Sequence, residues 1–126
     1  MVTQSNSFSS ALEYHRAGHL LEAVDLYKAA LHENPKTAAA LSNLAVLMTR
    51  IGEFENAATM YKQILSINPN DPNTLSNLGN LMLTQGNIIE AESYYIQAIQ
   101  IDPNLAPAHI NLGNAQLKLG KLEEAV

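Results

Sequence analysis

The chain has 126 residues, of which 47% are hydrophobic and 15% charged, and its formal net charge is −5. This composition is typical of a folded protein, and the negative charge argues against nucleic acid or an anionic membrane surface as a partner. The lack of cysteine excludes disulfides and thiolate chemistry, and no apolar run approaches the ~20 residues of a membrane span, so we expect a cytoplasmic protein without a secretory signal.

The first two helices are predicted over residues 5–16 and 20–33, within a segment that covers residues 4–37. Gly18 should separate them, because glycine readily adopts the left-handed conformation that ends many helices. Pro35 should end the second helix near Asn34, since proline lacks an N–H and disfavours helix in the residue before it. The segment is therefore predicted to be a helical hairpin.

The next segment, residues 38–71, has glycine and proline at the same places, and its helices are expected near residues 38–50 and 54–66. Gly52 lies between these helices and Pro69 follows them. Apolar residues at helical spacing lie on one face of each helix: Leu41, Leu44, Leu47 and Met48 on the first, and Ala57, Tyr61, Ile64 and Leu65 on the second. Each face is too narrow to be buried within one hairpin, so neighbouring hairpins must stack.

Residues 72–105 repeat this pattern, with helices expected near residues 72–84 and 88–100. The segment LSNLAVLM at residues 41–48 recurs as LSNLGNLM at residues 75–82, 34 residues later. Thr37 and Asp71 each lie four residues before one of these segments. Both residue types cap helix N-termini, and Pro72 is tolerated in the first turn of a helix.

A fourth segment, residues 106–126, begins in the same way and stops after 21 positions. We expect one helix near residues 106–118 and the beginning of another over 121–126, with Gly120 between them. Such a short second helix would leave a face of Leu112, Ala115 and Leu119 partly uncovered. Because repeat arrays end in an element with a polar outer face, we expect a fragment of a longer protein that can self-associate through this uncapped C-terminal end.

Four sets of residues recur at the period of 34: Gly18, Gly52, Gly86 and Gly120; Pro35, Pro69 and Pro103; Ala23, Ala57, Ala91 and Ala125; Tyr27, Tyr61 and Tyr95. A fixed period of this length indicates stacked supersecondary units. The predicted fold is all-α, a solenoid of stacked antiparallel helix hairpins that forms a single domain over residues 1–126. Its repeats are 4–37, 38–71, 72–105 and, in part, 106–126.

Small residues occur where the two helices of each hairpin should cross: Ala45, Gly79 and Gly113 on the first helices, and Ala57, Ala91 and Ala125 on the second. Small side chains allow helix axes to approach to the short end of the ~8–10 Å packing range. The tyrosines one turn later are interpreted as core residues with the hydroxyl at the edge.

This pattern resembles the tetratricopeptide repeat family. The matching residues are Leu44, Ala45, Gly52, Ala57, Tyr61 and Pro69, then Leu78, Gly79, Gly86, Ala91, Tyr95, Ala98 and Pro103, then Leu112, Gly113, Gly120 and Ala125. The first segment matches through Gly18, Ala23, Tyr27, Ala30 and Pro35, but it has Ser7 and Ser10 where the family prefers large apolar residues, as expected of a terminal unit facing solvent. The resemblance implies a right-handed superhelix whose first helices line a concave groove, and it implies binding of other proteins without chemistry of its own.

One subset of this family holds a C-terminal carboxylate with lysines, an arginine and asparagines. In this sequence the lysine positions of that subset hold Phe8 and Asn73, and its arginine position holds Asn77. The departure argues against a carboxylate clamp and against docking to chaperone tails.

Asparagines form a ladder in successive repeats, with Asn43, Asn77 and Asn111 at one position and Asn80 and Asn114 one turn later on the same face. In the resembling fold this face points into the groove, where primary amides could pair with the backbone of an extended peptide, similar to the tetratricopeptide arm of protein O-GlcNAc transferases. The same amides could instead hydrogen-bond between neighbouring first helices or be solvated. Arg50 and Lys118 share another repeat position with Arg16, and they are either groove cations or part of a solvated face.

No catalytic, cofactor or metal site is expected. His15 and His19 have a spacing that can bind zinc on a helix, but Gly18 should end the helix between them. Two functions stay open: a non-catalytic module that binds a peptide or partner segment in its groove, or a substrate-recruiting or assembly arm of a larger enzyme such as an O-GlcNAc-transferase-like glycosyltransferase. A scaffold that assembles with copies of itself is a third interpretation.

Overall fold

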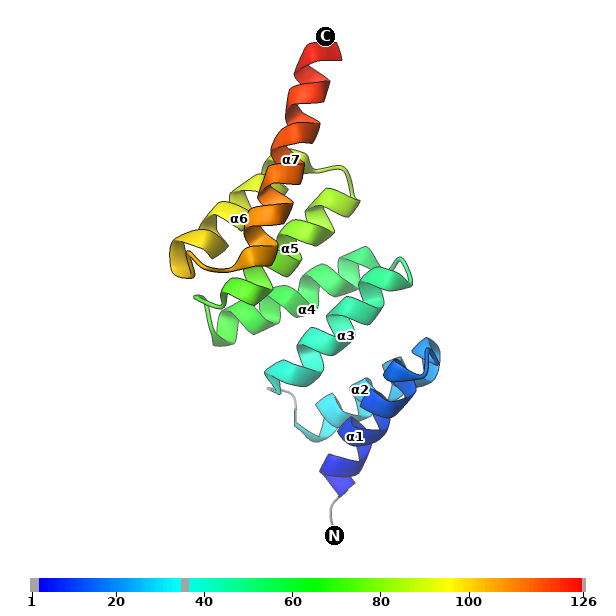
Figure 1. Ribbon diagram of the computed structural model, residues 1–126. Coiled ribbons are helices and arrows are strands. Elements are labelled where there is room, and N and C mark those ends of the chain that lie inside the picture. Colours follow the sequence, from blue (N-terminus) through cyan, green and yellow to red (C-terminus); the bar gives the residue numbers. More distant parts are fainter. Residues whose placement is uncertain (1–2, 35–36, 126) are drawn as a thin grey trace. The chain divides into compact units, whose positions relative to one another are not determined.

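The computed structural model describes residues 3–34 and 37–125, and this part of the chain consists of α-helices without any strand (Figure 1). The helices are α1 (Thr3–Arg16), α2 (Leu20–Glu33), α3 (Ala38–Arg50), α4 (Phe54–Ile67), α5 (Pro72–Thr84), α6 (Ile88–Ile101) and α7 (Ala106–Ala125). They form two compact units, unit 1 over Met1–Ile67 and unit 2 over Asn68–Val126. The all-α class expected from the sequence is confirmed.

The first six helices lie where the sequence predicts them, and the largest difference is at α1, which begins at Thr3 instead of residue 5. Gly18, Gly52 and Gly86 end the first helix of each hairpin with φ angles of 85°, 85° and 84°. In each case the next residue donates its N–H to a carbonyl in the last turn, at 2.9 Å for His19 to Tyr14. This is the C-terminal capping motif in which a glycine in the left-handed conformation ends a helix, and it directs the chain into the second helix.

The prediction of two helices over residues 106–118 and 121–126 was wrong, because α7 continues through Gly120 to Ala125. Gly120 is not among the glycines with a positive φ. A turn at this glycine is favourable only if the helix that follows can pack back onto the first one. The few residues after Gly120 cannot form a stable separate helix, whereas extending α7 adds one backbone hydrogen bond for each residue that joins it.

Of the two residues predicted to cap helix N-termini, Asp71 does so with its side chain and Thr37 does not. The Asp71 carboxylate accepts hydrogen bonds from the Asn73 N–H at 3.2 Å and from the Thr74 hydroxyl at 2.8 Å, and it therefore caps α5 as expected. Thr37 occupies the corresponding position before α3 but forms no side-chain cap hydrogen bond, so that part of the prediction was wrong. The predicted role of Pro35 at the end of α2 lies outside the described residues.

The core of unit 1 forms where α1 packs against α2, α2 against α3 and α3 against α4. Its fully buried side chains include Ala45 and Ala57, the small residues predicted at the crossing of α3 and α4. Tyr27 is fully buried as well, and its ring lies 6.0 Å from that of Phe8 between centroids. The tyrosines are therefore core residues, as the sequence indicated.

In unit 2, α6 packs against both α5 and α7. A Cβ atom added at Gly79 would lie 2.6 Å from Cε1 of Tyr95, so glycine at this position is required by the close approach of α5 and α6. We also expected a close contact between helices at Gly113, and this was wrong, because a Cβ atom added there would meet nothing within 4 Å. No ring is packed against Gly113 in the described part of the chain, whereas Gly79 faces Tyr95. The side chain of Ala125 lies outside the described residues.

The face of α7 that we expected to be partly uncovered is covered by α6 at Ala115 and Leu112. Ala115 is fully buried in a cluster with Ala91 and Tyr95, and Leu112 packs against this cluster. Among the side chains of α7 that the structure describes, Ile110 and Leu117 are strongly exposed apolar residues, at 64% and 65%.

Candidate functional site

A buried tyrosine hydroxyl joins the first three helices of unit 1. The hydroxyl of Tyr27 on α2 lies 3.0 Å from Nδ1 of His15 on α1. Burial raises the pKa of Tyr27, while a hydrogen bond from Asn43 on α3 and the charge of Arg16 act in the opposite direction. Asn43, the first residue of the predicted ladder, therefore lies close to a side chain of the neighbouring hairpin in unit 1.

Unit 2 contains a corresponding cluster around Tyr95. The Tyr95 hydroxyl on α6 donates to Oδ1 of Asn80 on α5 at 2.6 Å, and Nδ2 of Asn111 on α7 donates to the same oxygen at 2.9 Å. Burial raises the pKa of Tyr95 to about 12, so the phenol stays protonated at neutral pH. Two members of the predicted ladder, Asn80 and Asn111, thus meet across neighbouring first helices.

These hydrogen bonds decide which amide groups are left for a ligand. A primary amide has one acceptor oxygen and two donor hydrogens. The oxygen of Asn80 accepts both bonds of the cluster, while Asn111 uses one hydrogen. The remaining groups are both Nδ2 hydrogens of Asn80, and the Oδ1 acceptor and second Nδ2 hydrogen of Asn111, so donors and an acceptor lie close together at the surface of unit 2.

One face of α7 extends this polar pair. At 100° per residue, Ile110, Asn111, Asn114, Leu117 and Lys118 fall within one third of the helix circumference. We call these five residues the α7 face. Asn114 and Lys118 are exposed, and Asn111 is half-buried. The α7 face therefore combines amide groups, two strongly exposed apolar side chains and one cation.

The other predicted site residues lie apart from this face. Asn77 on α5 is half-buried, and Arg50 is exposed in the last turn of α3 in unit 1. The charge of Arg50, together with desolvation as the larger cause, lowers the pKa of His15. The structure thus brings Asn80 and Asn111 together, and it places Asn43 and Arg50 in the other unit.

Sequence reasoning missed three residues of these surfaces. Ile110 and Leu117 were not predicted as site residues, although their polar counterparts elsewhere, such as Ser42 and Thr49, are a signal that could have identified them. His15 was considered only as a metal ligand. Its position next to the last residue of α1, where the second repeat has the polar residue Thr49, could have indicated a polar partner for the tyrosine.

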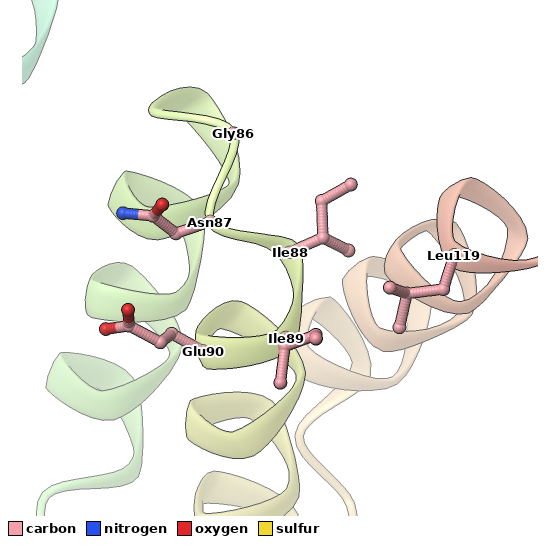
Figure 2. A pocket seen from close by; sticks show the side chains of 6 residues that line it. All are labelled: Gly86, Asn87, Ile88, Ile89, Glu90 and Leu119. Carbon is pink, nitrogen blue, oxygen red and sulfur yellow. The ribbon is translucent and has the colours of Figure 1, made fainter. Parts of the chain in front are cut away.

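A shallow hollow of about 300 Å³ lies where the α5–α6 loop approaches the later part of α7 (Figure 2). Figure 2 shows the side chains of Ile88, Ile89 and Leu119 directed toward this hollow, while Asn87 and Glu90 point to the other side. Ile89 is 71% exposed. The hollow is therefore an apolar surface at the end of unit 2.

Among the described residues, no three histidine or acidic side chains gather closely enough to hold a metal ion. Within the same part of the chain, none of the helices combines the length and hydrophobicity needed to cross a membrane.

Comparison with solved structures shows the same fold. The first tetratricopeptide domain of Spaghetti (RPAP3), bound to the HSP90 peptide SRMEEVD, is 20% identical, with a TM-score of 0.85 and coverage of 93% of each chain. The Sgt2 tetratricopeptide domain from Aspergillus fumigatus is 21% identical, with a TM-score of 0.87 over 98% of this chain and 83% of that one. An O-GlcNAc transferase from Thermobaculum terrenum is 25% identical, with a TM-score of 0.80 over 90% of this chain and 22% of that one.

No curated protein matches the chain. Two family models described as tetratricopeptide repeat do match it, one over residues 14–76 and 82–126 and the other over residues 60–93. The first of these covers most of the chain and agrees with the helix pattern, the glycine turns and the fold. The chain is therefore a member of the tetratricopeptide repeat family.

Proposed function

We propose that this chain is a non-catalytic interaction module in which the α7 face and Asn80 bind an extended peptide segment of a partner protein. The observation that carries the proposal is the pair Asn80–Asn111. Their mutual hydrogen bond fixes two amides at the surface and leaves two donors on Asn80, and one donor and an acceptor on Asn111.

Such a pair matches the backbone of an extended peptide, which offers an N–H and a C=O at every residue. Because the Tyr95 hydroxyl also holds Asn80, the amides are ordered before a ligand arrives, and binding costs less side-chain entropy. The contact would recognise backbone and not sequence. Preference among peptides would come from Ile110 and Leu117, which can bury apolar side chains of the ligand.

The proposed ligand differs from that of the related domain in complex with the HSP90 peptide SRMEEVD. That peptide carries three acidic residues and a terminal carboxylate. Here Phe8, Asn73 and Asn77 occupy the positions of the carboxylate-binding lysines and arginine, and the whole chain carries a net charge of −5. We therefore expect peptides with exposed apolar side chains and low negative charge to bind, and SRMEEVD to bind poorly.

The experiment begins with the immobilised 126-residue chain and a random peptide display library. Enriched peptides and SRMEEVD are then synthesised, and their affinities are measured by calorimetry. Truncation of Asn111 and Asn114 to alanine should weaken the enriched peptides by roughly 5–150-fold, as expected for lost hydrogen bonds. The matched control is Gln116→Ala, which removes an exposed amide from the opposite side of the same helix and should leave affinity unchanged.

Enriched peptides that bind the Asn111–Asn114 double variant as tightly as the original chain would refute the amide-based site. Tight binding of SRMEEVD would show instead that the chain uses a carboxylate-binding mode in spite of its missing cations. Circular dichroism of each variant at equal concentration checks that the helices are retained.

Further expectations from the sequence belong to this proposal. A role as the recruiting arm of a larger glycosyltransferase-like enzyme is the alternative, and the chain covers only 22% of the O-GlcNAc transferase that it resembles in fold. Self-association would use the hollow lined by Ile88, Ile89 and Leu119. Light scattering over a concentration series, with Ile89→Ser as the comparison, tests that part. We place the protein in the cytoplasm.

A further inference from the structure

The hairpin of α1 and α2 carries a second hollow, of about 410 Å³, that the proposed peptide surface does not use. Ser10 and Tyr14 line it from α1, and Glu22, Asp25 and Leu26 line it from α2. These residues are spaced i, i+4 on α1 and i, i+3, i+4 on α2, so each set projects from one side of its helix. Both helices belong to unit 1.

The hollow lies beside a position at which repeat 1 has a small polar residue, Ser10, in place of leucine. Leu44 and Leu78 are the counterparts of Ser10 in the second and third repeats, and both are fully buried. The serine side chain is too small to fill that space. The counterpart of Tyr14 in the second repeat is Met48, which is 3% exposed, whereas Tyr14 is 42% exposed. Repeat 1 thus presents an accessible aromatic ring beside an empty side-chain position.

The lining has the chemistry of a site for a cation with an apolar stem. The Tyr14 ring and Leu26 supply an apolar wall, and the exposed carboxylates of Glu22 and Asp25 supply two negative charges beside it. The Tyr14 ring is held edge-on against the ring of His19, with centroids 5.9 Å apart. An orientated aromatic face next to carboxylates favours a guanidinium, which stacks on rings and donates N–H hydrogen bonds to carboxylates along its planar edge.

We propose that this hollow, lined by Ser10, Tyr14, Glu22, Asp25 and Leu26, binds an arginine side chain of a partner polypeptide. The aliphatic stem lies along Leu26, the guanidinium stacks on Tyr14, and its N–H groups donate to the carboxylates of Glu22 and Asp25. Anionic ligands are excluded by the same two charges. Because a single cation at an exposed site gains little energy, we expect a dissociation constant on the order of millimolar for an isolated arginine.

The test uses N-acetyl-arginine N-methylamide as the probe and the citrulline analogue as its neutral counterpart of equal shape. Both are titrated into the ¹⁵N-labelled 126-residue chain, and amide chemical shifts are recorded. The arginine probe should shift the amides around Ser10, Tyr14 and Leu26 in a saturable manner. The citrulline probe should bind at least fivefold more weakly, because it lacks the charge. The corresponding lysine derivative should lie between the two.

Two sets of variants localise the binding. Ser10→Leu fills the hollow with the residue that the other repeats carry and should abolish saturable shifts, whereas Ser9→Leu adds the same bulk at an exposed neighbouring position and should not. Glu22→Gln combined with Asp25→Asn should weaken the arginine probe at least fivefold. Glu53→Gln combined with Glu55→Gln also removes two negative charges from exposed positions of unit 1 and serves as the control for net charge.

Equal affinity for the arginine and citrulline probes would overturn the proposal, as would saturable shifts confined to other helices. Unchanged binding by the Ser10→Leu protein would do the same. If Ser10→Leu perturbs the spectrum as a whole, the Glu22–Asp25 double variant, which keeps the shape of both side chains, decides the outcome.

Discussion

Replacement of Gly79 by alanine tests the packing of unit 2 most directly. The added Cβ would stand 2.6 Å from Cε1 of Tyr95 and 2.9 Å from its Cδ1 and Cζ. Carbon atoms in favourable contact are ~3.5–4.0 Å apart, so the ring or the helix must move by roughly 1 Å. The ring cannot move freely, because Tyr95 is fully buried and its hydroxyl is held by Asn80.

The size of the effect follows from two opposing terms. Overpacking of a core costs about 1–3 kcal/mol, whereas glycine to alanine inside a helix gains about 0.5–1 kcal/mol. The net expectation for Gly79→Ala is a loss of about 1 kcal/mol in the free energy of unfolding, from a range of roughly 0–2.5 kcal/mol. Gly113→Ala is the matched control, because Gly113 has the same repeat position and an added Cβ meets nothing within 4 Å. That variant should gain about 0.5–1 kcal/mol.

Urea unfolding followed by circular dichroism at equal protein concentration measures both variants. The opposite signs of the two shifts are the decisive result, since both substitutions change helix propensity by the same amount. A third comparison uses Tyr95→Leu, in which the ring is removed. In that background Gly79→Ala should behave like Gly113→Ala. If Gly79→Ala stabilises the original chain as much as Gly113→Ala does, the close approach of α5 and α6 is not what requires glycine there.

Three further predictions concern the core and its titrating groups. Ala91→Leu should lower stability by about 1–3 kcal/mol because Ala91 is fully buried in the cluster with Tyr95 and Ala115. Thermal unfolding measures this effect, with Gln97→Leu as the control at an exposed site. Equal melting temperatures of the two variants would contradict the prediction. The pKa of Tyr95 is raised from 10.0 to about 12 by burial, so its contribution to stability is fully present below pH 10 and is lost as pH rises to about 12. Tyr95→Phe should therefore lose less stability than the original chain over that window in urea unfolding, and equal losses would contradict this prediction. The pKa of His15 is lowered below 6.5, so its contribution to the free energy of unfolding is present above pH 6.5 and is lost as pH falls further. His15→Thr should therefore be destabilised less by acid than the original chain. An identical dependence of stability on pH in the two proteins would refute the role of His15.

The sequence alone determined the hairpin pattern of this protein. Gly18, Gly52 and Gly86 mark helix ends because the left-handed conformation that they adopt is a property of one residue and its immediate neighbours. The positions of the small and aromatic core residues were also predictable, since helical periodicity states which residues share a face. For the same reason the ladder of asparagines could be recognised, although the partner of each amide could not.

Tertiary structure decided what these local signals do. Gly120 has the same repeat position as Gly86, yet α7 continues through it, because a glycine turn persists only when the following helix has a surface and a length sufficient to pack back. Gly79 and Gly113 also share a repeat position, and only the first faces a ring. Asn80 and Asn111 are 31 residues apart, and their hydrogen bond depends on α5, α6 and α7 meeting around the Tyr95 hydroxyl. A contact of this kind depends on the distance between helices, and the spacing of residues in the sequence does not specify that distance.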